Sequence, residues 1–245
     1  MRRRYGATAL AAGFVFTAVL AMSLIFPSAG FAYEEAKVAN GGTVKGKITY
    51  KGTVPTRKVV PTKDQNICGG PREDPLIVVG PGGGVKDAVV YIKDIEAGKP
   101  FDMPKSPASI DNKDCRFHPH VQVAREGPVD IHNSDNTLHN THGFYGKKTA
   151  FNVALPLQGM QVKQTLKESG VVRVECDSHG WMRGWIYVVD NPYYALTAED
   201  GTFTIADVPP GEHTVLIWQE ETGVMEKAVT VKPGETATLD VELKK

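Results

Sequence analysis

The chain has 245 residues, 41% of them hydrophobic and 23% charged, which is the composition of an ordinary globular protein. Its 28 lysines and arginines balance its 28 aspartates and glutamates. This balance lacks the strong positive charge that nucleic acid or an anionic membrane surface would require. We therefore expect neither of these as a partner.

The N-terminus has the pattern of an export signal. Basic residues at Arg2–Arg4 come before an apolar run from Ala7 to Phe26, and small residues follow up to Ala32. This order predicts a signal peptide over residues 1–32, cleaved after Ala32, and export to the periplasm. The apolar run could also span a bilayer, so an uncleaved anchor is the alternative and the one expected link to a membrane.

The rest of the chain predicts an all-β fold. Apolar and polar residues alternate from Val44 to Tyr50, which indicates a strand with one buried face. Gly82–Gly84 is interpreted as a turn, because it lacks the lysine of a phosphate loop and precedes a strand. Many short strands separated by turn residues predict a sandwich or barrel. The expected strands cover residues 44–50, 85–92, 121–123, 129–132, 171–176, 185–189, 203–205, 214–218, 228–231 and 238–243.

Three cysteines are an odd number for a chain bound for an oxidising compartment. Cys68 and Cys115 lie in polar, turn-like surroundings, whereas Cys176 ends an apolar strand. We expect a disulfide between Cys68 and Cys115, although sequence alone does not fix the pairing. Cys176 would then be a free thiol.

The segment from Val172 to Met182 carries the strongest chemical pattern. Val172, Val174 and Cys176 share one strand face, so the thiol should point into the core where the strand ends. The turn that follows can bring His179 and Met182 to the same point. Thiolate and thioether are soft ligands and imidazole is intermediate, a set that favours copper, with zinc as the less favoured metal. Each residue alone would more often be structural; the conjunction favours a site.

The spacing Cys176-x-x-His179-x-x-Met182 resembles the ligand loop of the cupredoxins, the blue copper proteins, and amicyanin in particular. Upstream, Asn133-x-Asp135 followed by His139-Asn140 is similar to the same family. The resemblance covers about residues 108–190. It implies a Greek-key sandwich and one copper ion cycling between Cu(I) and Cu(II). It also implies that His139 is a ligand and that Asn140 braces the cysteine loop.

Two residues of the ligand loop depart from the family pattern. Gly180 stands where the family often has proline, and the bulky Trp181 could shield the copper edge.

The identity of the first histidine ligand is also open, because His142 is a rival to His139. His118 and His120 share a strand face that Cys115 does not, so we interpret them as strand or surface residues.

The flanking segments resemble a second family. Residues 41–50, 85–92, 198–205 and 208–215 are similar to carboxypeptidase regulatory-like domains, which are small transthyretin-like and carbohydrate-binding-like β-sandwiches. Together with the copper segment they resemble exported methylamine-utilisation-like proteins. The expected organisation is a sandwich from residues 41–99 and 192–245, with a cupredoxin-like domain of residues 100–190 inserted.

These patterns predict an exported electron carrier with a type 1-like His₂-Cys-Met site and an unidentified periplasmic redox partner. Motifs of serine hydrolases and zinc proteases are missing, so we expect no enzyme. The alternative is non-redox copper handling, or binding of a glycan or protein partner through the flanking sandwich.

Overall fold

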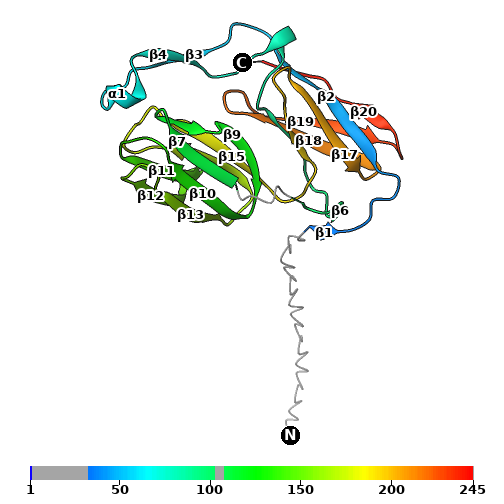
Figure 1. Cartoon of the computed structure of the whole chain (residues 1–245). Helices are drawn as coiled ribbons and strands as arrows, with labels where there is room; N and C mark the ends of the chain where they lie inside the picture. Colours follow the sequence, from blue (N-terminus) through cyan, green and yellow to red (C-terminus); the bar gives the residue numbers. More distant parts are fainter. Residues whose placement is uncertain (2–32, 103–107, 245) are drawn as a thin grey trace. The chain divides into compact units, whose positions relative to one another are not determined.

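The computed structural model describes residue 1, residues 33–102 and residues 108–244. Residues 2–32 of the expected signal peptide and residues 103–107 of the expected cupredoxin-like domain lie outside the described residues. Almost all regular structure is β, which confirms the predicted all-β class (Figure 1). Among the described residues, no helix is both long and apolar enough to cross a membrane.

The central part of the chain, residues 108–189, forms a sandwich of two sheets. One sheet has the order β13-β10-β7-β8 and the other the order β12-β11-β14-β15-β9. We call this the copper-site sandwich, after the site that the sequence predicts there. Its strands are β7 (Ala108–Lys113), β8 (Arg116–His118), β9 (Val121–Arg125), β10 (Gly127–Asn133), β11 (His139–Tyr145), β12 (Lys148–Leu155), β13 (Gln161–Leu166), β14 (Gly170–Glu175) and β15 (Arg183–Val189).

Alternation explains this sandwich. In β10 and β14 every second side chain is buried, including Val129 and Ile131 in one strand and Val172 and Val174 in the other. These apolar side chains meet between the sheets in one buried core. Burial of both inner faces is what holds the two sheets together.

Segments before and after this sandwich form a second one, which we call the flanking sandwich. One sheet has the order β16-β5-β18-β19, and the other has β17-β2-β20 with β21 also paired to β2. Its strands are β2 (Gly42–Tyr50), β5 (Val89–Ile92), β16 (Tyr194–Leu196), β17 (Thr202–Val208), β18 (Gly211–Gln219), β19 (Gly223–Val231), β20 (Thr236–Thr238) and β21 (Val241–Leu243). The smaller elements are β1 (Glu34–Glu35), β6 (Ala97–Gly98), β3 (Thr56–Val59), α1 (Gln65–Cys68), β4 (Arg72–Pro75) and the 3₁₀ turn η1 (Pro81–Gly83).

Strand β5 is buried on both faces because its alternate residues enter two different cores. Val90 and Ile92 pack in the core of the flanking sandwich. Val89 and Tyr91 instead join a third cluster with Tyr187 of β15. A strand covered on both sides is expected to be apolar throughout, as this one is.

Two predicted strands are shorter than expected. The strand predicted at residues 85–92 begins at Val89, because Asp87 has a φ of 60° that interrupts the extended backbone. The strand predicted at residues 238–243 is two strands, β20 and β21. They are separated at Asp240, whose carboxylate accepts a hydrogen bond of 2.8 Å from the backbone of Lys47.

The glycine cluster at residues 82–84 is part of a turn, as predicted, and the structure shows why glycine is needed. A Cβ on Gly84 would lie 1.8 Å from the backbone oxygen of Asp200. Two backbone segments therefore cross here at a distance that no side chain allows.

Residues 56–75 contact the copper-site sandwich at several points. The sequence predicts that they belong to the flanking sandwich. β3 and β4 pair with each other, and α1 lies between them in the chain. We call residues 56–75 the clasp; Figure 1 shows β3, β4 and α1 as a separate stretch.

Candidate metal centre

The candidate site lies at one end of the copper-site sandwich. His139 is the first residue of β11, and Cys176 directly follows β14. His179 and Met182 lie in the turn between β14 and β15, which is closed by a hydrogen bond of 2.8 Å from the Met182 N–H to the His179 carbonyl. Neighbouring strands β11 and β14 pair antiparallel, so the start of one meets the end of the other.

Three donor atoms converge there. The distance from Cys176 Sγ to Nδ1 is 3.9 Å for His139 and 3.7 Å for His179, and the two Nδ1 atoms are 3.1 Å apart. His139 and His179 are fully buried, and Cys176 is 1% exposed. Three polar groups removed from water and turned toward one another form a donor set that one bound ion could satisfy.

The other ring nitrogen of each histidine is held by a carboxylate. His139 Nε2 donates to Asp135 Oδ2 at 2.9 Å, and His179 Nε2 donates to Asp64 Oδ2 at the same distance. An ionised carboxylate only accepts, so each Nε2 carries the proton. Both Nδ1 atoms therefore present lone pairs toward each other and toward the sulfur, an arrangement that a bound cation would stabilise.

The donor spacing fits such a cation. Bonds of about 2.0 Å to nitrogen and about 2.3 Å to sulfur, at 120°, put two nitrogens about 3.5 Å apart and nitrogen and sulfur about 3.7 Å apart. The distance of 3.1 Å between the two nitrogens is somewhat shorter than the first of these values, and the sulfur–nitrogen distances of 3.7 and 3.9 Å match the second or slightly exceed it. The chain thus provides a compact N₂S set that a metal could occupy without moving the backbone.

Burial sets the protonation of two of these groups. It lowers the pKa of His139, although Asp135 acts in the opposite direction, and so favours the neutral imidazole that a metal requires. Burial also raises the pKa of the Cys176 thiol, against the backbone N–H of Asn140, which donates to Sγ at 3.4 Å. A bound metal ion would displace the thiol proton.

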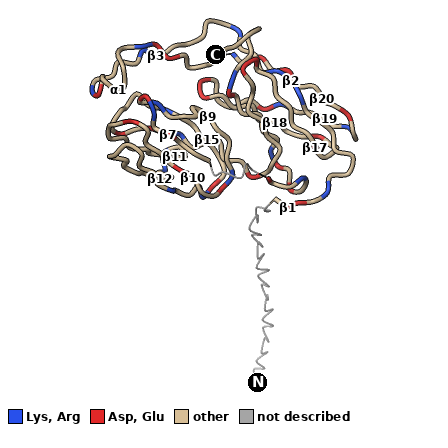
Figure 2. The backbone as a smooth tube through the Cα atoms, viewed as in Figure 1, with Lys and Arg blue, Asp and Glu red and all other residues tan. Residues whose placement is uncertain are grey.

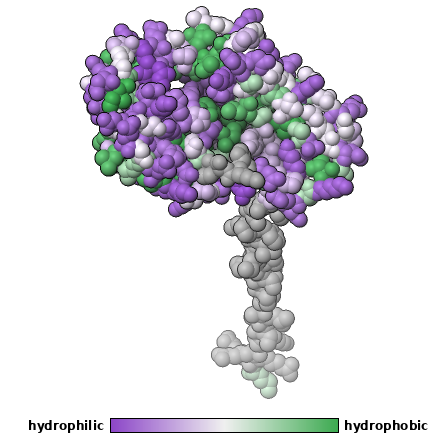
Figure 3. Space-filling model, viewed as in Figure 1, coloured by the Kyte–Doolittle hydropathy of each residue, from purple (hydrophilic) through white to green (hydrophobic). Residues whose placement is uncertain are grey.

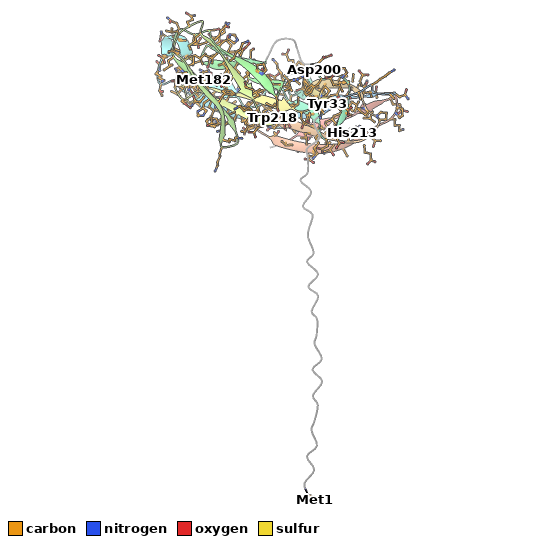
Figure 4. The ribbon with its side chains drawn as sticks, turned by 90° about the horizontal axis from the view of Figure 1, so that it is seen from below. Met1, Tyr33, Met182, Asp200, His213 and Trp218 are labelled. Atoms are coloured by element: carbon orange, nitrogen blue, oxygen red, sulfur yellow. A yellow bond between two sulfur atoms is a disulfide. The ribbon has the colours of Figure 1, made fainter. Side chains whose placement is uncertain are left out.

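Met182 lies next to these donors in the chain and packs in the core of the copper-site sandwich, where it is 3% exposed. Figure 4 labels Met182, far from His213. Trp181 lies over His179, with ring centroids 5.1 Å apart. A Cβ on Gly180 would meet no atom within 4 Å, so the loop has room at the position where the family often has proline.

Asn140 lies where a brace for the cysteine loop would be. Its side-chain oxygen accepts a hydrogen bond of 3.2 Å from the backbone of Asp177, and its backbone N–H faces the Cys176 sulfur. It thereby links the start of β11 to the residue after the thiol.

The other histidines lie apart from the three donors. His142 is on the opposite face of β11, with Nδ1 3.2 Å from the Asp177 carboxylate and Nε2 3.1 Å from Thr149 Oγ1. His118 and His120 are exposed, and His213 Nε2 contacts the Pro209 carbonyl at 2.7 Å.

The cysteines are arranged as predicted. Cys68 and Cys115 form a disulfide, and Cys176 is a buried free thiol. A sulfur from each disulfide cysteine and a ring nitrogen of His179 lie within 4.8 Å of one another. The disulfide therefore packs directly behind the candidate site.

Sequence reasoning did not predict the two carboxylates. Asp135 lies four residues before His139, in a motif that was noted without a role. Asp64 lies 115 positions from His179 and belongs to the clasp. Polar residues in turns are too common for either to be distinguished by its surroundings in the sequence.

A comparison with known families gives a match in the C-terminal half of the chain. A family model described as polysaccharide lyase family 4, domain II, matches residues 168–239. The match starts in the copper-site sandwich and continues into the flanking sandwich. It does not support the predicted likeness to carboxypeptidase regulatory-like domains.

Two curated relatives are similar over part of the chain. The probable rhamnogalacturonate lyase A of Aspergillus flavus is 33% identical over 30% of this chain and 14% of its own length. The rhamnogalacturonate lyase A of Emericella nidulans is 38% identical over 26% of this chain and 12% of its own length. The chain thus spans only about an eighth of either relative.

These partial matches to relatives and to a family named as lyases overturn the expectation of no enzyme and indicate an enzyme-related protein. The expectation rested on missing motifs of serine hydrolases and zinc proteases. Those motifs serve particular kinds of hydrolysis, so their absence does not speak against other enzyme chemistry.

Several solved structures match part of the chain at low overall similarity. They include a purple cupredoxin from Nitrosopumilus maritimus (24% identity, 34% of this chain, 99% of that chain, TM-score 0.30). Amicyanin from Paracoccus versutus matches at 17% identity over 41% of this chain and 97% of its own, with a TM-score of 0.31. A copper-containing nitrite reductase from Thermus scotoductus matches at 19% identity over 36% of this chain and 23% of its own, with a TM-score of 0.30. We draw no conclusion about the metal from these scores.

Proposed function

We propose that this chain binds one copper ion through His139, Cys176, His179 and Met182 and carries single electrons. One observation supports this most strongly: two imidazoles whose Nε2 atoms are held by carboxylates direct their Nδ1 lone pairs at one buried thiol. An N₂S set beside a thioether is the donor chemistry of type 1 copper sites. Zinc is the less favoured occupant.

Bound copper would supply one-electron redox chemistry between its cuprous and cupric forms. The chain's own residues would favour electron transfer by keeping the ligand positions fixed in both oxidation states. His139 is fixed by Asp135, and the Cys176 loop is fixed by Asn140. Full burial of both histidines excludes water from the donor set. Met182 would offer its thioether to the copper and would adjust the potential.

The proposed setting is outside the cytoplasm. The N-terminal pattern supports export to the periplasm. There the partner would be a redox protein. Positively and negatively charged residues are interspersed along the described chain (Figure 2). On the face in Figure 3 hydrophilic residues cover most of the surface, with hydrophobic residues in smaller groups.

The test is cupric ion added to the mature protein. We predict an intense visible band from charge transfer between sulfur and copper, at one copper per chain. Cys176→Ala should abolish the band, and the control His142→Ala should keep it, because His142 lies on the opposite face of β11. Binding without a band, or with tight cuprous binding and no redox cycling, would instead support copper storage or delivery.

A second candidate function follows from the matches over residues 168–239. In this case the flanking sandwich would bind polysaccharide, because the matching family and the two relatives are named as polysaccharide or rhamnogalacturonate lyases. Retardation of the mature protein in gels containing rhamnogalacturonan would support this. Unchanged mobility, with no unsaturated product released, would count against it.

A further inference from the structure

The clasp is fastened to the copper-site sandwich at several points. The Cys68–Cys115 disulfide joins α1 to the residue before β8. Each end of the clasp is hydrogen-bonded to the copper-site sandwich. At one end Arg57 Nη2 of the clasp donates to the Trp181 carbonyl at 2.9 Å. At the other end Arg116 Nη2 of β8 donates to Asp74 Oδ1 of the clasp, also at 2.9 Å. These contacts hold a segment from outside residues 108–189 against the ligand turn.

Asp64 is the clasp residue that reaches the site. It stands at the N-cap of α1, where an aspartate ordinarily accepts a hydrogen bond from its own helix. Its side chain makes no such bond; its Oδ2 accepts from His179 Nε2 at 2.9 Å. The backbone of Asp64 is left-handed, with a φ of 51°, a conformation that few residues other than glycine, asparagine and aspartate adopt readily. The Asp64 carboxylate therefore does not cap its own helix and instead accepts the hydrogen bond from His179.

The disulfide keeps Asp64 at this place. Cys68 is in the turn that Asp64 begins, and its backbone N–H donates to the Asp64 carbonyl at 2.8 Å. Its partner Cys115 is fully buried, and its N–H donates to Asp135 Oδ2 at 2.9 Å. The disulfide bond therefore links the turn that contains Asp64 to Cys115, the residue that contacts Asp135.

We propose that Asp64 is a positioning residue for His179, delivered and retained by the disulfide-fastened clasp. This inference rests on the proposed copper function. The carboxylate fixes the Nε2–H tautomer and the ring orientation, and it increases the basicity of Nδ1. A more basic nitrogen favours the cupric over the cuprous ion, so Asp64 lowers the reduction potential. It also covers the Nε2 edge of His179, leaving that ring fully buried.

Asp64 and Asp135 hold equivalent atoms but differ in origin. Asp135 belongs to the loop between β10 and β11 of the copper-site sandwich itself. Asp64 comes from the clasp and has 36% of its side chain exposed. Its contribution can therefore be removed without opening the sandwich core.

The experiment measures the reduction potential of the copper-loaded mature protein and of two variants. Asp64→Asn keeps an acceptor for Nε2 but removes the charge, and Asp64→Gly removes both while suiting the left-handed backbone. Loss of a partner of this kind typically weakens metal binding about 10- to 100-fold. If the loss falls on the cupric ion, the potential rises by roughly 60 to 120 mV, from 59 mV per tenfold. Asp64→Gly should shift it at least as far as Asp64→Asn.

Glu73→Gln is the matched control, because it removes one exposed negative charge from the same clasp; it should leave the potential unchanged. The double variant Cys68→Ser/Cys115→Ser should raise the potential in the same direction as Asp64→Asn, because the clasp is then released. Unchanged potentials in both Asp64 variants, with the visible band intact, would overturn the role of Asp64. A wild-type protein that binds no copper would instead refute the proposed function itself.

Discussion

Replacing Asp135 by asparagine should destabilise the metal-free protein by about 3 kcal/mol. Asp135 is 6% exposed and accepts three hydrogen bonds. Oδ1 accepts from the Asp114 N–H at 2.8 Å, and Oδ2 accepts from the Cys115 N–H and His139 Nε2, each at 2.9 Å. Asparagine has one oxygen and a donating amide, so in either orientation at least one backbone N–H faces another donor.

The magnitude follows from that count. One hydrogen bond to a charged acceptor contributes about 1.5 to 3 kcal/mol, and a buried donor left unpaired costs about 1 to 3 kcal/mol. Because part of the second cost is contained in the first, about 3 kcal/mol is the expected total. This total applies to the better orientation of the asparagine, in which its oxygen keeps the hydrogen bonds from Cys115 and His139 and only the one from the Asp114 N–H is lost.

The assay is urea unfolding of the chelator-treated mature protein, monitored by tryptophan fluorescence. The midpoint should fall with an unchanged slope, since the surface exposed on unfolding is the same. Asp177→Asn is the control: its side chain is 54% exposed, and the change should stay within about 0.5 kcal/mol. A loss below about 1 kcal/mol for Asp135→Asn would refute the reasoning from these three hydrogen bonds.

Two further predictions concern other parts of the structure. Met182→Leu conserves volume in the core, so copper should stay bound while the potential rises, as voltammetry would show; complete loss of copper would contradict a weak axial role. At His120 burial acts to lower the pKa, but the Glu220 carboxylate outweighs it and the pKa is raised. A raised folded-state pKa means that this pair stabilises the protein fully below the unfolded value of about 6.5 and loses the effect as pH rises through the folded value. With 44% of the His120 side chain exposed, the effect should be under about 1 kcal/mol. Urea midpoints of wild type and His120→Gln should converge at alkaline pH, and a difference that grows with pH would contradict the assignment.

Local patterns in the sequence were enough to predict much of the site. Alternation in β14 places Val172, Val174 and Cys176 on one buried face, and the turn after it limits where His179 can lie. The odd cysteine count indicated one free thiol, and the turn-like surroundings of Cys68 and Cys115 favoured the disulfide that the structure contains. The same alternation could have decided between His139 and His142. They are three residues apart on one strand and so lie on opposite faces.

Long-range contacts could not be predicted in this way. The contact of Asp64 with His179 depends on how residues 56–75 fold back on a sandwich that begins at residue 108. No periodicity in the clasp indicates that return. The early end of the strand before Val89 likewise depends on the left-handed backbone of Asp87, which aspartate tolerates but does not require.

X-ray absorption at the copper edge of the loaded mature protein tests the central claim most directly. The account predicts one sulfur at a short distance and two imidazole nitrogens at about 2.0 Å, as a His139, Cys176 and His179 donor set requires. The sulfur contribution should disappear in Cys176→Ala. A copper environment of nitrogen and oxygen alone in the wild-type protein would contradict the proposed site.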